Sequence, residues 1–219
     1  MTLGYKVIIL ILLNITINNK LIAKNTIFLY IRTILTIAVT FYTSRVILKT
    51  LGVEDFGIYS VVGGIVAMVG FFNGVLGVAT QRFLSYEIGR KDYIQLNKTF
   101  SATIIIHIFI GIIVFWFAES IGIWIVNNKL NLPNGRLDSA RWIFHFSVLS
   151  FIINILQTPY NALIIAKEKM NFYAYISIIE VVLKLLVVFL LELMPFDKLK
   201  VYGVLLFIVS LIVGLVYIV

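Results

Sequence analysis

The segment TFYTSRVILKTLGVEDFGIYSVVGG, residues 40–64, joins two long apolar stretches through a short charged corner. Arg45 and Lys49 come at the end of the first stretch, where cations meet the negative end of a helix dipole. Gly52 follows and is predicted to take a left-handed helix-cap conformation. An acidic pair ending at Asp55 then precedes the second stretch, where acidic side chains favour a helix start. The segment therefore predicts a helical hairpin whose corner lies at a membrane surface.

The composition extends this interpretation to the whole chain. Of the 219 residues, 61% are hydrophobic and only 13% are charged, and the mean hydropathy is +1.06. Apolar runs of about twenty residues recur, which is the length that a helix needs to cross a hydrocarbon core roughly 30 Å thick. The runs are continuously apolar and do not alternate, which excludes a β-barrel. We therefore predict an all-α membrane protein that is embedded in the lipid bilayer.

Several function classes are disfavoured by what the sequence lacks. There is no cysteine, so disulfides and thiolate metal sites are excluded. The formal charge of +8 is spread over short loops, which argues against nucleic-acid binding. No glycine-rich phosphate loop, GxSxG or HExxH motif is present. We expect a protein that is not an enzyme and that has no cofactor.

Six membrane spans are predicted, and they divide the chain into two parts. Residues 1–19 form a short apolar extension whose apolar run is too short to span, and residues 20–219 form a helical transmembrane lobe. The last run reaches the final residue with no interfacial anchor, so we expect the sequence to be a fragment. The predicted spans are 25–48, 58–80, 101–125, 142–166, 172–193 and 199–219.

The distribution of Lys and Arg in the loops predicts the orientation, because cytoplasmic loops carry the excess of cations. With the amino terminus inside, the inner loops carry nine Lys and Arg and the outer loops carry seven. The loop 81–98 contributes four of the nine. We therefore expect a multi-pass protein of the cytoplasmic membrane with a cytoplasmic amino terminus.

Polar and small side chains recur at helical spacing within three of these spans. The stripe in 25–48 is made of threonines, and the stripe in 58–80 is made mostly of glycine and other small residues. The stripe in 142–166 includes Asn154 and Gln157 and contains Pro159. Such stripes either join neighbouring helices by close packing and hydrogen bonds or line a water-filled cavity. Both alternatives stay open for the threonine and amide stripes, whereas the glycine stripe favours packing.

Charged side chains inside the spans are the strongest functional signal, because each costs about 2.5–3.5 kcal/mol at the bilayer centre. Glu180 and Lys184 are one helical turn apart in the favourable order for an ion pair. They either neutralise each other or contact a substrate or proton. Arg32, Arg45 and Arg82, together with Lys184, would give a cavity a cationic character suited to phosphate.

Three segments carry a resemblance to a known family. These are SRVILKTLGVEDFGIYSVVGG (44–64), ATQRFLSYEIGRKD (79–92) and QTPYNALIIAKEKMNFYAYISIIEVVLKL (157–185). They resemble the Wzx-like polysaccharide biosynthesis flippases of the multidrug/oligosaccharidyl-lipid/polysaccharide exporter superfamily. The likeness covers roughly residues 20–219, and the chain corresponds to about one of the two lobes of that fold.

The resemblance implies that an undecaprenyl-pyrophosphate-linked oligosaccharide moves from the cytoplasmic to the periplasmic leaflet, for O-antigen or capsule synthesis. It implies a central cavity with functional charges, some members being coupled to an ion gradient, and it implies a second lobe or a polysaccharide polymerase as partner. Carried onto this chain, the charged candidates are Arg32, Arg45, Glu180 and Lys184, with Arg82 as a weaker one. With the polar stripe added, the predicted substrate or ion pathway comprises Arg32, Arg45, Arg82, Asn154, Gln157, Glu180 and Lys184.

Two alternatives remain at this stage. The first is a multidrug or small-solute antiporter of the same superfamily, for which an acidic cavity would be expected if the drugs are cationic. The second is a membrane scaffold without transport activity, or a gene remnant. In that case, neutralising Glu180 or Lys184 would change only the expression level.

Overall fold

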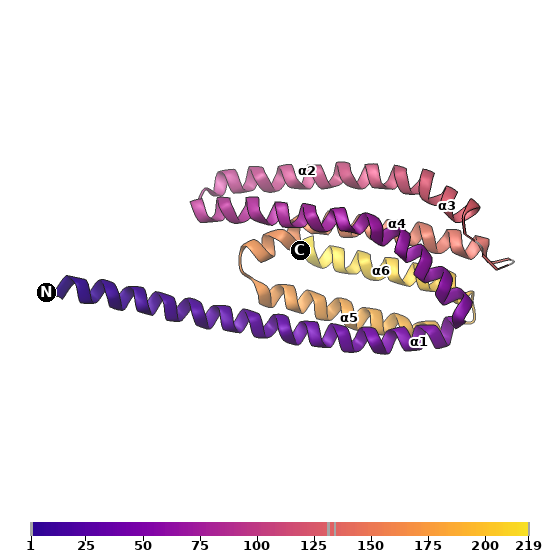
Figure 1. Ribbon diagram of the computed structural model, residues 1–219, viewed down its shortest axis with the longest axis horizontal. Helices are drawn as coiled ribbons and strands as arrows, with labels where there is room; N and C mark the ends of the chain where they lie inside the picture. Colours follow the sequence, from indigo (N-terminus) through magenta and orange to yellow (C-terminus); the bar gives the residue numbers. More distant parts are fainter. Residues whose placement is uncertain (1, 131, 134, 219) are drawn as a thin grey trace.

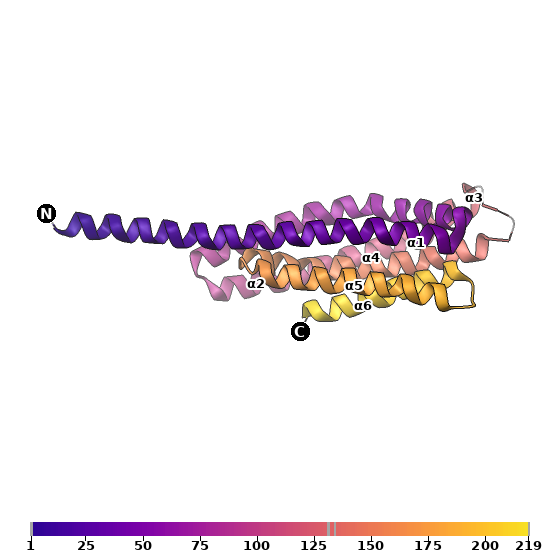
Figure 2. The same ribbon diagram turned by 90° about the horizontal axis from the view of Figure 1, so that it is seen from below.

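The computed structural model describes residues 2–130, 132–133 and 135–218 of the chain, and within these ranges all regular secondary structure is helical. The helices run along one common axis in an up-and-down bundle (Figures 1 and 2). They are α1 (Thr2–Arg90), α2 (Tyr93–Phe117), a π-helical segment (Ala118–Gly122), α3 (Ile123–Asn128), α4 (Leu137–Ala166), α5 (Met170–Leu193) and α6 (Lys198–Ile218).

The sharp bend of α1 at Gly52 is the feature that organises the fold. The backbone of Gly52 has φ 80° and ψ 170°, a region that is essentially restricted to glycine. The positive φ agrees with the prediction, whereas the extended ψ differs from a left-handed helix cap. The chain reverses direction at this point, so that α1 forms two arms, one on each side of the bend (Figure 1).

The fold confirms the predicted all-α membrane bundle. Within the described residues, five helices are long and apolar enough to cross a membrane, and the first of them spans Asn25–Arg90. Because α1 turns back at Gly52, its two arms account for the first two of the six predicted spans. The helices are longer than the spans that hydropathy alone delimits, since α1 continues to Arg90 and α2 begins at Tyr93.

The amino-terminal part of α1 extends past the rest of the bundle (Figures 1 and 2). The helix runs without interruption from Thr2 into the first arm. The predicted separate extension over residues 1–19 is therefore helical from Thr2 onward. Its separation from the lobe as a unit stays a prediction.

A π-helical segment interrupts the path from α2 to α3. It spans Ala118–Gly122, and its last residue lies against the ring of Phe144 in α4. A Cβ added at Gly122 would come within 2.3 Å of that ring. Glycine here allows the close approach of the two helices, and Glu119 from the same segment places its Oε1 2.8 Å from Nδ1 of His145.

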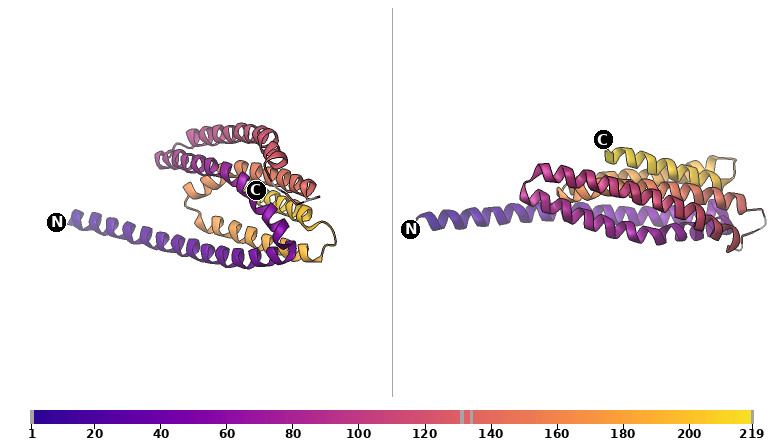
Figure 3. Two further views of the ribbon diagram at one scale, coloured as in Figure 1. Left: turned by 45° about the vertical axis from the view of Figure 1, so that its right-hand side comes forward. Right: turned by 90° about the horizontal axis from the view of Figure 1, so that it is seen from above.

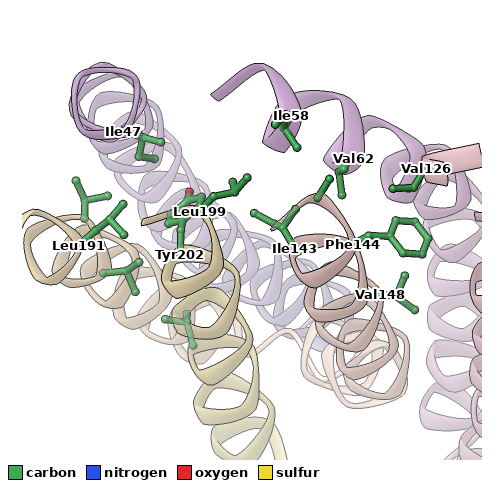
Figure 4. Packing of buried hydrophobic residues seen from close by; sticks show 14 of the residues in the cluster. Ile47, Ile58, Val62, Val126, Ile143, Phe144, Val148, Leu191, Leu199 and Tyr202 are labelled. Atoms are coloured by element: carbon green, nitrogen blue, oxygen red, sulfur yellow. The ribbon is translucent and has the colours of Figure 1, made fainter. Parts of the chain in front are cut away.

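Helix α4 lies at the centre of the bundle and contacts α1, α2, α5 and α6 (Figure 3). Its buried residue Ile143 lies on the side that faces Tyr202 of α6, whereas Phe144 and Val148 lie on the opposite side, which faces Val126 of α3 (Figure 4). Many large apolar side chains on the outer surfaces of α1 and α2 remain exposed. Such a surface suits hydrocarbon, because helices satisfy their own backbone groups and need no water on their outer faces.

A central polar cavity as candidate functional site

A cavity of about 530 Å³ lies between the two arms of α1 and helices α4, α5 and α6. Its volume is within the range of small-molecule sites, roughly 300–1,000 Å³. The wall combines aliphatic and aromatic side chains with hydroxyl, amide and charged groups. Its polar lining residues, tyrosines aside, are Thr40, Thr43, Ser44, Ser147, Ser150, Asn154, Gln157, Glu180, Lys184 and Ser210.

Helix α4 supplies the most continuous polar wall of the cavity. Ser147, Ser150, Asn154 and Gln157 follow one another at intervals of three, four and three residues, which places them on one helical face. The Ser150 hydroxyl donates to the Phe146 carbonyl at 2.8 Å, and the Asn154 amide donates to the Ser150 carbonyl at 2.8 Å. Both side chains keep acceptor oxygens that can face a solute.

Gln157 joins α4 to α6 at the same wall. It is buried, and its Nε2 donates to the carbonyl of Ser210 at 3.1 Å. Gly214 allows this contact, because a Cβ at that position would lie 3.0 Å from the same Nε2. The Gln157 side chain therefore both joins two helices and lines the cavity, which are the two roles that the sequence left open for the polar stripe of 142–166.

Glu180 and Lys184 of α5 are the charged residues that line the cavity. Nζ of Lys184 donates to Oε1 of Glu180 at 2.6 Å, and the side chains are 50% and 38% exposed, respectively. The pair neutralises itself across one turn of the helix. Together the two side chains bring no net charge to the cavity.

The two arms of α1 contribute hydroxyls and small residues. Thr40 and Thr43 line the cavity, whereas Thr33 and Thr36 of the same stripe do not. From the second arm, Gly63 and Ala67 leave space for the cavity.

Farther along the second arm, the small residues pack against α4. A Cβ at Gly70 would lie 3.6 Å from Phe151, and one at Gly77 would lie 3.1 Å from Thr158. The Thr158 hydroxyl donates to Oδ1 of Asn73 at 3.1 Å. The glycine stripe thus lines the cavity at one end and packs against a helix at the other.

The three arginines predicted for the pathway lie outside this cavity. Arg32 of α1 is half-buried and contacts α5, where its Cζ lies 4.3 Å from the centroid of the Tyr173 ring. Its Nε is buried and has no hydrogen-bond partner among the described residues. Arg45 is exposed, and Arg82, also exposed, borders a shallow groove whose walls all come from the second arm of α1.

Hydropathy and stripe patterns did not indicate the aromatic part of the wall. Tyr59 and Tyr202 meet edge to face, with ring centroids 5.0 Å apart, and Phe56 lies beside them in the lining. Aromatic residues are ordinary in membrane helices, so these carry no special signal. Ser210, the single serine within the apolar run of α6, offered a weak signal that could have been used.

The arrangement suits recognition of a polar solute by hydrogen bonding. Within the described residues, no group of three or more His, Asp or Glu side chains is placed to hold a metal ion. Hydroxyl and amide groups both donate and accept, and a cavity between helices of a bundle is a common place for a ligand.

Comparison with known proteins assigns the family. No curated protein and no solved structure matches the chain. The MatE family matches residues 27–190, which is about three-quarters of the sequence and runs from within the first arm of α1 to near the end of α5. The members of this family are transporters and not enzymes. The chain therefore belongs to the MatE family of the multidrug/oligosaccharidyl-lipid/polysaccharide exporter superfamily, and it is a transporter-type, multi-pass membrane protein.

Proposed function

We propose that this MatE-family protein takes part in moving a lipid-linked oligosaccharide across the cytoplasmic membrane, for the synthesis of a surface polysaccharide. One observation carries the proposal. The polar wall of the cavity consists mainly of neutral hydroxyl and amide groups, and its charged residues are a mutually neutralising pair. A glycan is rich in groups that both donate and accept hydrogen bonds, which matches such a wall.

The pyrophosphate of such a substrate needs cations, and the first arm of α1 offers them outside the cavity. Arg32 lies two turns before the cavity residue Thr40, and its buried Nε has no hydrogen-bond partner in the described part of the chain. Guanidinium groups suit phosphate oxygens because they can donate two parallel hydrogen bonds. In this proposal the glycan occupies the cavity, the pyrophosphate lies toward Arg32, and the polyprenyl tail stays in lipid.

A multidrug or small-solute antiporter is the second candidate. The aromatic side chains of Phe56, Tyr59 and Phe151 line the same cavity as Glu180. An aromatic wall with a carboxylate is suited to a flat organic cation. Lys184 opposes this candidate, because its ammonium group lies 2.6 Å from the carboxylate.

A binding experiment on the chain in lipid nanodiscs separates the two candidates. The chain is titrated with a fluorescent polyprenyl-pyrophosphate-linked oligosaccharide and, in parallel, with ethidium as the organic cation. We expect saturable binding of the glycan lipid and weaker binding of polyprenyl pyrophosphate without the glycan. Replacing Ser150 by Leu should weaken the binding of the glycan lipid by about tenfold, because a buried bulky group removes hydrogen bonds and space.

Ser120→Leu is the matched control. Ser120 also donates its hydroxyl to its own helix, to the Trp116 carbonyl at 2.6 Å, but it does not line the cavity. Its replacement should leave the affinity unchanged. Binding of ethidium without binding of the glycan lipid would support the antiporter, and absence of both would support a scaffold without transport activity.

A further inference from the structure

An ionic cluster joins three segments at the end of the bundle where α1 bends. The Arg136 guanidinium bridges two carboxylates, with Nη2 3.1 Å from Oδ2 of Asp55 and Nη1 3.3 Å from Oδ2 of Asp197. Asp55 follows the bend in α1, Arg136 precedes α4, and Asp197 precedes α6. These three segments meet at the end opposite the α1–α2 and α4–α5 turns (Figure 1).

The Asp197 side of this cluster is held firmly. The Ser139 hydroxyl donates to Oδ2 at 2.6 Å, and the Leu199 amide donates to Oδ1 at 3.1 Å. Partial burial opposes ionisation of the carboxyl group, but these hydrogen bonds and the charge of Arg136 outweigh it and keep the pKa of Asp197 below its ordinary value of 3.8. Asp197 therefore remains an anionic anchor for Arg136 over the physiological pH range.

The Asp55 side of the cluster depends on one contact. Asp55 is only 4% exposed, and its Oδ1 is buried without a hydrogen-bond partner among the described residues. Its Oδ2 contacts Arg136. A buried carboxylate that loses its cation is strongly disfavoured, so the Arg136 guanidinium holds the start of the second arm to the segment that precedes α4.

The position of the cluster relates it to the cavity. Phe56, the next residue after Asp55, and Tyr59, one helical turn after it, line the cavity, and Tyr59 contacts Tyr202 of α6. Gly52 lies three residues before Asp55, and no atom lies within 4 Å of a Cβ placed on it. The bend thus has both the backbone freedom of glycine and open space around it.

We propose that the Arg136 cluster is a latch that closes the cavity at this end of the bundle, and that its release lets the start of the second arm of α1 move away from α4 and α6, with the backbone of Gly52 taking up the change. The orientation expected from the loop charges places this end on the outer side of the membrane. The latch concerns how the cavity opens and not which solute enters it. It rests on the proposed function only in that the cavity serves as the transport path.

The absence of cysteine allows the movement to be measured with introduced labels. Spin labels on Val53→Cys and Leu137→Cys report the distance across the latch, since both side chains are exposed. In the parent chain we expect one narrow main population and a small longer-distance population. Asp55→Asn, which keeps the shape and removes the charge, should add a longer-distance population that is about tenfold larger than in the parent, because a charge-assisted bond is lost.

Reactivity inside the cavity provides a second measurement. Ser150→Cys places a thiol in the cavity wall, and its modification by a water-soluble methanethiosulfonate should be several-fold faster when Asp55→Asn is also present. A label pair on Tyr93→Cys and Lys167→Cys, at the other end of the bundle (Figure 1), should keep its distance. Neither measurement requires a substrate. The latch proposal can therefore be wrong while the proposed function is right, and the proposed function can be wrong while the latch proposal is right.

The matched control is Asp138→Asn. Asp138 contacts Lys200 at the same end of the bundle, but its side chain is 67% exposed and it does not contact Arg136. This variant should behave as the parent.

If Asp55→Asn does not yield a folded chain, Asp197→Asn weakens the latch from the other side and is judged by the same criteria. A variant with a lower melting temperature but unchanged distances and thiol reactivity would overturn the proposal, because the cluster would then be only a structural contact.

Discussion

At the scale of single residues, the Glu180–Lys184 pair shows how two costly charges are accommodated in a membrane helix. The 2.6 Å contact is local to α5, and the partial exposure of both side chains to the cavity screens them further. The pair is consequently compatible with a membrane helix without a third partner, and either residue alone would be unpaired.

Neutralising one member of this pair should destabilise the chain more than neutralising both. We expect Glu180→Gln or Lys184→Gln to lower the free energy of unfolding by about 1 kcal/mol, because one ion is left unpaired. The double variant should recover most of this loss. Glu192→Gln, at the exposed end of the same helix, is the control. Unfolding midpoints in detergent give the four values, and strictly additive losses would show that the pair is not coupled.

At the scale of helices, close contacts at glycines determine where neighbouring segments meet. Gly122 ends the π-helical segment and touches the Phe144 ring of α4. Gly64, in the second arm of α1, has open space around it, since a Cβ added there would meet no atom within 4 Å. The two glycines therefore differ in packing although both lie in helices.

Alanine substitution should separate the two positions. Gly122→Ala should destabilise the chain by about 1–3 kcal/mol, because the new methyl group collides with a buried ring. Gly64→Ala should be neutral or stabilising by up to about 1 kcal/mol, since alanine favours helix. Adding Phe144→Leu to Gly122→Ala should return part of the stability. Thermal unfolding measures all three, and equal melting temperatures for the two alanine variants would contradict the packing argument.

At the scale of the whole molecule, polar and apolar surfaces are distributed as expected for a helical bundle in lipid. The hydroxyl and amide groups of α4 face the cavity, whereas large apolar side chains such as Phe109 of α2 are 63% exposed on the outside. The same charged side chain should therefore have different effects in the two environments.

A lysine introduced on each surface tests this distribution. Phe109→Lys places an ammonium group in hydrocarbon at a cost of about 2.5–3.5 kcal/mol, and we expect a marked loss of folded protein. Ser150→Lys places the same group in the polar wall of the cavity, which Glu180 also lines, and the folded yield should stay close to that of the parent. Size-exclusion profiles of membrane extracts measure both, and equal yields would mean that the cavity is no more polar than the outer surface.

Local properties of the chain were sufficient to predict that it is a membrane protein, that residues 40–64 form a hairpin, and that Glu180 and Lys184 form an ion pair within one helix. Helix hydrogen bonds form within a segment, so twenty apolar residues predict a span without knowledge of its neighbours. A glycine between two such segments predicts a bend, and Glu180 with Lys184 predicts a contact because residues four apart share a helical face.

Packing between distant segments decided which residues line the cavity and which charged residues pair across the chain. Helical periodicity places residues on one face but does not say which helix that face meets, so Thr40 reaches the cavity and Arg45 does not. The contacts of Arg136 with Asp55 and Asp197 join residues 81 and 61 positions apart. No local pattern encodes such separations, because the rotation and tilt of each helix are set by side-chain packing against the others.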